Sequence, residues 1–155
     1  MNIALVLDGS SSIDPTHFDI EKEFAKNVTA AFAEMSLFDN GGSASYVQFS
    51  WGVDDSDTGT FYSQDDFNDF VDANPFIGGA TNIYDGIDAA RELLNAAPNA
   101  SDAFMYVVLD GNADYGYLNI SDVADEARAD GITLMSIGVG KEYVKMCLVN
   151  ENKLA

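Results

Sequence analysis

The clearest pattern in the chain is a set of short apolar runs, each followed by an acid or a glycine. Residues 3–7 (IALVL) stop at Asp8, and residues 103–109 (AFMYVVL) stop at Asp110. A third run covers residues 132–139. Runs without polar alternation are typical of strands that are buried on both faces, as in the centre of a parallel sheet. The pattern therefore predicts three central strands.

Helical spacing of apolar residues fills much of the chain between these runs. Asp14 is a good N-cap and Pro15 a good first residue for a helix of about five turns. Its apolar stripe is expected at Phe18, Phe24, Val28, Ala31, Phe32 and Met35. Further helices are expected over residues 64–73, 83–95 and 123–130, and a last one is expected to begin in residues 142–149.

Residues 44–49 and 58–62 read as two strands joined by an acidic turn, which predicts an antiparallel hairpin at one edge of the sheet. Strands that alternate with helices are typical of α/β proteins. We therefore expect a doubly wound, mostly parallel central sheet with one antiparallel edge strand and helices on both faces.

Length and composition favour one folded domain, because 155 residues with 47% hydrophobic content can bury a substantial core. We expect this single domain over residues 1–152, excised from a longer chain. Residues 153–155 (KLA) are interpreted as a vector scar. No apolar run approaches the roughly 18 residues that span a bilayer.

The net charge of −19, from 26 acids and 7 bases, narrows the range of partners. Such a surface repels nucleic acids and anionic membranes, so neither is expected to bind. Strong acidity suits a salty or extracellular medium, or the binding of divalent cations. Three glycosylation sequons, at Asn27, Asn99 and Asn119, agree with an extracellular or cell-surface location.

Candidate chemistry gathers at the predicted carboxyl ends of the central strands. Asp8 and Asp110 would share one rim of the sheet, where ligands bind in open α/β folds. Ser10 and Ser12 follow Asp8, and Thr81 lies in a glycine loop before a helix. Carboxylate and hydroxyl oxygens suit a hard cation such as Mg²⁺, with Mn²⁺ or Ca²⁺ as alternatives.

The sequences DGSSS at residues 8–12, GGATN at 78–82 and VVLDG at 107–111 resemble the von Willebrand factor type A domain with its metal-ion-dependent adhesion site. The residues of the first motif are similar to those of integrin, collagen and matrix members of this family. The resemblance implies a Rossmann-like fold in which Ser10, Ser12 and Thr81 bind Mg²⁺ directly. It also implies that Asp8 and Asp110 act through water, and that an Asp or Glu carboxylate of a protein ligand completes the metal shell. That ligand would be an extracellular matrix or cell-surface protein.

Two features depart from the family pattern. The chain ends soon after the last apolar run, so the family's final strand and much of its final helix are expected to be missing or reduced. Asn112 and Asp114 follow Asp110 in an acid-rich segment that is a candidate for a second cation.

We do not expect an enzyme, and two other function classes are kept as alternatives. A metal-dependent hydrolase of the phosphatase type needs a second acid two residues after the first, and Ser10 stands there. The lone histidine, His17, lies at a helix start and is a poor base for a serine nucleophile. A scaffold domain that binds partners without metal is the other alternative.

Overall fold

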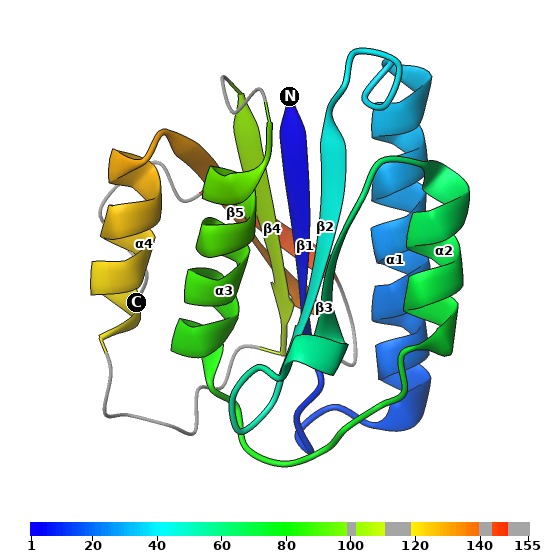
Figure 1. Cartoon of the computed structure of the whole chain (residues 1–155). Coiled ribbons are helices and arrows are strands. Elements are labelled where there is room, and N and C mark those ends of the chain that lie inside the picture. Colours follow the sequence, from blue (N-terminus) through cyan, green and yellow to red (C-terminus); the bar gives the residue numbers. More distant parts are fainter. Residues whose placement is uncertain (99–101, 111–118, 140–143, 149–155) are drawn as a thin grey trace.

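The computed structural model describes residues 1–98, 102–110, 119–139 and 144–148 (Figure 1). The strands are β1 (Asn2–Asp8), β2 (Ser43–Phe49), β3 (Thr58–Phe61), β4 (Ala103–Leu109), β5 (Ile132–Val139) and β6 (Val144–Leu148). The helices are α1 (Pro15–Glu34), η1 (Asp55–Asp57, a 3₁₀ turn), α2 (Gln64–Ala73), α3 (Ile83–Ala96) and α4 (Ile120–Ala129). The strands form one sheet in the order β3-β2-β1-β4-β5-β6.

The centre of the sheet is parallel, as the apolar runs predict. Strand β1 pairs in parallel with β2 on one side and with β4 on the other, and β4 pairs in parallel with β5. Strand β3 pairs antiparallel with β2 at one edge, which confirms the predicted hairpin. The doubly wound, mostly parallel architecture is therefore confirmed.

The opposite edge carries a strand that the sequence did not predict. Strand β6 (Val144–Leu148) pairs antiparallel with β5, in register from Val139↔Val144 to Met135↔Leu148. The expectation of a helix beginning in residues 142–149 is wrong over this stretch. Residues 144–148 pair with the edge of β5 instead of forming a helix on a face of the sheet. The proposed scar at residues 153–155 lies outside the described residues.

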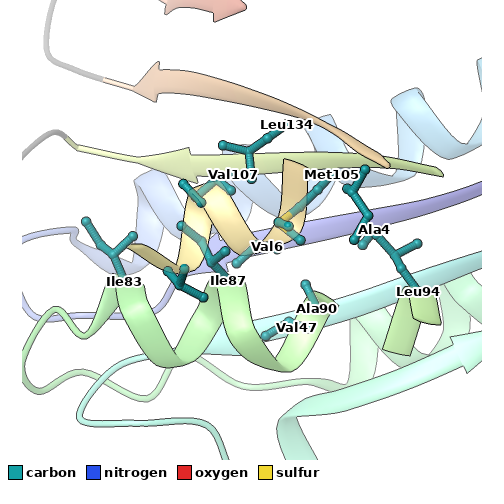
Figure 2. Packing of buried hydrophobic residues seen from close by; sticks show 14 of the residues in the cluster. Ala4, Val6, Val47, Ile83, Ile87, Ala90, Leu94, Met105, Val107 and Leu134 are labelled. Atoms are coloured by element: carbon teal, nitrogen blue, oxygen red, sulfur yellow. The ribbon is translucent and has the colours of Figure 1, made fainter. Parts of the chain in front are cut away.

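Helices cover both faces of the sheet (Figure 1). On one face, Ala4 and Val6 of β1 pack with residues of α3 and α4, including Ile87 and Leu94 (Figure 2). On the other face, Ile3 and the other odd-numbered apolar residues of β1 pack with α1 and α2. Successive side chains of a strand point to opposite faces, so these two cores explain why residues 3–7 have no polar position.

Helix α1 begins as predicted, and its inner face combines most of the predicted apolar stripe with two polar residues. The Asp14 side chain accepts a hydrogen bond from the backbone N–H of His17 at 3.0 Å, and Pro15 is the first helical residue. The fully buried positions are Phe18, Glu21, Ala25 and Thr29. Met35, expected on the inner face, is 68% exposed beyond the end of the helix. Phe24, Val28 and Phe32 are partly buried against the core, as predicted. The predicted stripe contained apolar residues alone and therefore did not include Glu21 and Thr29.

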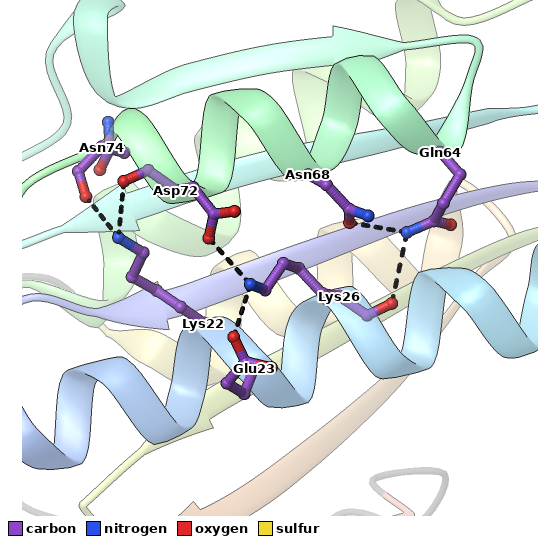
Figure 3. Close-up of polar contacts among 7 residues, drawn as sticks. All are labelled: Lys22, Glu23, Lys26, Gln64, Asn68, Asp72 and Asn74. Atoms are coloured by element: carbon purple, nitrogen blue, oxygen red, sulfur yellow. Dashed lines mark hydrogen bonds and ion pairs between the residues drawn. The ribbon is translucent and has the colours of Figure 1, made fainter.

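Polar contacts join α1 to α2 near the start of the loop that leads to Thr81 (Figure 3). Lys22 Nζ donates hydrogen bonds to the carbonyl oxygens of Asp72 (3.2 Å) and Asn74 (3.0 Å). Lys26 Nζ forms ion pairs with Asp72 at 2.8 Å and with Glu23. A cation at the C-terminal end of a helix is favourable because unpaired carbonyl groups point there. These contacts fix the point at which the chain leaves α2.

Candidate metal centre

The predicted site residues lie where β1 and β4 end. These strands are parallel neighbours, and Asp8 is the last residue of β1 while Asp110 directly follows β4. The chain leaves β1 toward α1 on one face, whereas α3 and α4 cover the other face. The carboxyl ends of β1 and β4 therefore mark the topological switch point of the sheet, where ligands bind in folds of this class.

Asp8 is buried, and its carboxyl group is only partly satisfied. Oδ1 accepts a hydrogen bond from the backbone N–H of Ser10 at 2.9 Å. Oδ2 is buried and has no hydrogen-bond partner. Burial, followed by the like charge of Asp110, raises the pKa of Asp8 to about 6, although hydrogen bonding from Ser10 opposes the rise. The nearby charge that acts on Asp8, that of Asp110, is therefore negative like its own.

The two serines face one another across the turn after β1. Ser10 is buried and Ser12 is exposed, and their Oγ atoms are 2.8 Å apart. A hydroxyl oxygen keeps a lone pair after donating one hydrogen bond. The pair therefore keeps lone pairs with which its neutral oxygen atoms could bind a cation.

Thr81 is held at the same rim by backbone contacts between two loops. The N–H of Gly78 donates to the carbonyl oxygen of Gly9 at 2.8 Å, and the N–H of Ser11 donates to the carbonyl oxygen of Gly79 at 2.9 Å. The N–H of Gly79 also donates to Ser11 Oγ at 2.7 Å. Thr81 is 1% exposed, and its Oγ1 is a buried oxygen with no hydrogen-bond partner.

The oxygen atoms at this rim fit a hard cation. Buried polar atoms in proteins are nearly always paired, so the unpaired Asp8 Oδ2 and Thr81 Oγ1 need a partner that the protein itself does not supply. The two serine hydroxyls and two carboxylates complete an all-oxygen set of the kind that Mg²⁺ prefers. Within the described residues, no group of three or more His, Cys, Asp or Glu is placed to hold a metal.

The geometry of the rim gives no information about the candidate site for a second cation. Asn112 and Asp114 lie outside the described residues, as does most of the segment that follows Asp110.

Glu21 is the residue at this site that the sequence analysis missed. It lies on α1, is fully buried, and its Oε2 accepts a hydrogen bond from the backbone N–H of Asp8 at 3.1 Å. Burial, and then the charges of Asp8 and Asp110, raise the pKa of Glu21 to about 9, so the group is protonated at neutral pH. A signal was available in the sequence, because Glu21 stands at helical spacing between Phe18 and Ala25.

Curated proteins similar to this chain come from the extracellular matrix and the cell surface. The collagen alpha-1(XXI) chain of Xenopus laevis is 30% identical over 142 residues, which cover 91% of this chain and 14% of the collagen. Human cochlin is 30% identical over 144 residues, which cover 90% of this chain and 25% of cochlin. Human integrin alpha-E is 26% identical over 91% of this chain and 12% of the integrin. The chain thus spans a quarter or less of these relatives.

Solved structures show the same fold. Proximal thread matrix protein 1 from the mussel byssus superposes with a TM-score of 0.76 at 25% identity, covering 92% of this chain and 38% of that protein. A second structure of that protein, described as having a zinc-occupied MIDAS motif, gives a TM-score of 0.75. The pilus adhesin SpaC of Lactobacillus rhamnosus GG shares the fold at 15% identity, with a TM-score of 0.67.

The relatives also bear on two expectations, that the chain is not an enzyme and that it is extracellular or at the cell surface. They are matrix and adhesion proteins and not enzymes, and they are extracellular or located at the cell surface, which confirms both expectations. In the part of the chain that the structure describes, no helix is long and apolar enough to cross a membrane. The sequence matches the von Willebrand factor type A domain over residues 2–150, and the chain belongs to that family.

Proposed function

We propose that this domain binds a protein ligand through a divalent cation, Mg²⁺ under physiological conditions, held at the rim formed by β1 and β4. Ser10, Ser12 and Thr81 would bind the cation directly, while Asp8 and Asp110 would act through water. The bound cation supplies a positive centre that attracts an Asp or Glu carboxylate of the ligand. The ligand would belong to the extracellular matrix or the cell surface.

The observation that carries this proposal is the pair of unpaired oxygens. Asp8 Oδ2 and Thr81 Oγ1 are buried without partners on two loops that hydrogen bonds fasten together. Leaving a buried polar atom unpaired costs about 1–3 kcal/mol, so two such atoms at one rim are costly without a ligand. A cation would bind Thr81 Oγ1 directly and satisfy Asp8 Oδ2 through a bound water, and it would also relieve the repulsion between Asp8 and Asp110.

Calorimetric titration of the metal-free domain with Mg²⁺, Mn²⁺ and Ca²⁺ tests the metal site. We expect one-site binding that is lost in Asp110→Ala and in Thr81→Val, which keeps the size of the side chain and removes its oxygen. Thr133→Val on β5 is the matched control. Binding that Thr81→Val leaves unchanged would contradict the proposed ligand set. Absence of binding by the wild-type domain would favour a scaffold that works without metal.

The open position for a carboxylate has its own test. Mn²⁺ bound to the domain speeds the relaxation of water protons when water can reach the metal. We expect added acetate, as a probe for a ligand carboxylate, to lower this relaxation by displacing water from the cation. A relaxation rate that acetate does not change would argue against recognition through a carboxylate.

A further inference from the structure

The end of β1 is held differently on its two sides. On the side of β2, pairing continues to Asp8↔Phe49, and the N–H of Gly9 donates to the carbonyl oxygen of Phe49 at 2.8 Å. On the side of β4, the register stops one residue earlier, at Leu7↔Val108. The N–H of Asp8 donates to a side chain, Glu21 Oε2, at 3.1 Å. A helix carboxyl group therefore takes the place of a strand at this position.

The cost of this arrangement points to a role for Glu21. The residue is fully buried on the inner face of α1, between Phe18 and Ala25. Its Oε1 has no hydrogen-bond partner. A buried carboxyl group that is only half satisfied is destabilising, and an apolar side chain would fill the same place at lower cost.

A chain of hydrogen bonds runs from Glu21 to the candidate ligands. Glu21 accepts from the Asp8 amide, Asp8 Oδ1 accepts from the Ser10 amide at 2.9 Å, and Ser10 Oγ lies 2.8 Å from Ser12 Oγ. Each contact orients the group that makes the next one. Groups that hold metal ligands in place in this way affect metal affinity without touching the metal.

We propose that Glu21 is a positioning residue of the metal centre, whose carboxyl group fixes the Asp8 amide and thereby the placement of Asp8 and the Ser10–Ser12 pair. This inference rests on the proposed metal-dependent function. Glu21 stands behind the ligands and is not assigned as one of them, because its Oε2 accepts from the backbone amide of Asp8 and not from a group at the rim.

The test compares two replacements of Glu21 in the domain. Glu21→Gln keeps an oxygen that can accept from the Asp8 amide, whereas Glu21→Met keeps a similar volume without an acceptor. We expect Glu21→Gln to bind Mg²⁺ within about threefold of the wild-type affinity and Glu21→Met to bind about 10- to 100-fold more weakly. Wild-type affinity in Glu21→Met would overturn the proposal. Glu21→Leu, a second apolar replacement, serves if Glu21→Met does not fold.

The stability of the Glu21 variants distinguishes a positioning role of this residue from a merely structural one. Glu21→Met removes a half-satisfied buried carboxyl group but also leaves the buried Asp8 amide without an acceptor. These two effects oppose each other, so we expect the stability of the metal-free variant to change little while Mg²⁺ binding weakens. A large loss of stability that accounts for the loss of affinity would indicate a structural role and would overturn the proposal. Thr29→Val is the control, because it removes another buried, unpaired oxygen from the same helix face. We expect it to leave Mg²⁺ affinity unchanged.

Hydrogen exchange of the Asp8 amide in the metal-free domain gives a readout that needs no metal. We expect slow exchange in the wild type and in Glu21→Gln, and faster exchange in Glu21→Met. Equal protection in all three would overturn the proposed contact. If the wild type bound no Mg²⁺, the proposed function would fail. The exchange rates would still decide whether Glu21 fixes Asp8.

Discussion

The indole ring of Trp51 lies against Gly79, two residues before Thr81. A Cβ atom at Gly79 would lie 2.4 Å from Trp51 Nε1, and the φ angle of Gly79 is +107°. Asn82 on the other side of Thr81 donates hydrogen bonds to the carbonyl oxygens of Ser50 and Trp51. The segment that holds Thr81 is thus fixed against the end of β2, and it leaves no space for a side chain at residue 79.

Gly79→Ala should therefore damage both the fold and the metal centre. The positive φ costs about 1–2 kcal/mol for a residue with a Cβ atom, and the overlap with Trp51 adds to it. We expect a loss of at least about 2 kcal/mol in the free energy of unfolding, measured with urea, and weaker Mg²⁺ binding because Thr81 shifts.

Gly131→Ala is the matched control for this variant. Gly131 also has a positive φ, of +84°, but a Cβ atom there would meet nothing within 4 Å. We expect it to cost stability through backbone strain alone and to leave Mg²⁺ affinity unchanged. Equal effects of the two variants on Mg²⁺ binding would contradict the role assigned to the segment 78–82.

Much of this architecture follows from the sequence, because strands that are buried on both faces appear as continuous apolar runs. The runs at residues 3–7, 103–109 and 132–139 correspond to β1, β4 and β5, and α2 has the bounds that were predicted. The parallel order then brings Asp8 and Asp110 to one rim, although 102 positions (110 − 8) separate them. The location of the candidate site was thus predictable from the strand ends.

The parts that the sequence did not predict depend on tertiary contacts. Strand β6 forms because the edge of β5 offers unpaired backbone groups, and a helix signal from Glu142 onward gives no information about that edge. Glu21 was missed because an acid on a helix is normally exposed to solvent. Its helical spacing indicates the inner face, but the group that its carboxyl meets there, the Asp8 amide, becomes known only when α1 is packed against β1.

Mg²⁺ binding should weaken in acid because protons compete for Asp8. The pKa of this carboxyl group is raised to about 6, chiefly by burial. We expect nearly constant affinity above about pH 7 and a decrease as the pH falls through about 6, with proton release on binding near that pH. Calorimetry in buffers with different ionisation enthalpies measures both quantities. Affinity that is flat from about pH 5 to pH 8 would contradict direct competition at Asp8.

The stability of the metal-free domain should depend on pH through Glu21. Its pKa rises from 4.5 to about 9 on folding, so the stabilising contribution is complete below pH 4.5 and is lost as the pH rises toward about 9. Glu21→Gln does not titrate. We therefore expect its free energy of unfolding, relative to the wild type, to increase with pH across this window, by at most about 1.4 kcal/mol per pH unit. Urea unfolding at several pH values measures the difference. A constant difference would show that Glu21 ionises normally in the folded state.

Salt should stabilise the domain because its surface charge is poorly compensated. The net charge is −19, and the basic side chains of Lys22, Lys26, Arg91 and Arg128 are all engaged within the protein. Repulsion among the remaining acids weakens the folded state, and about 1 M salt shortens its range to about 3 Å. We expect the melting temperature to rise steadily as KCl is added to the metal-free domain. A melting temperature that falls with KCl would show that ion pairs outweigh the repulsion.

Asp8→Asn should separate stability from function most clearly. Asn keeps the shape of Asp8 and an oxygen that can accept from the Ser10 amide, but it removes a buried charge near Asp110. The pKa of Asp8 is raised from 3.8 to about 6, so we expect the metal-free variant to gain about 1–3 kcal/mol at neutral pH. Saturating Mg²⁺ should raise the melting temperature of the wild type and leave that of Asp8→Asn unchanged. Asp69→Asn, at an exposed position on α2, is the control and should change neither quantity. A metal-free Asp8→Asn domain that is less stable than the wild type would show that the Asp8 carboxylate stabilises the fold and is not kept there for the cation.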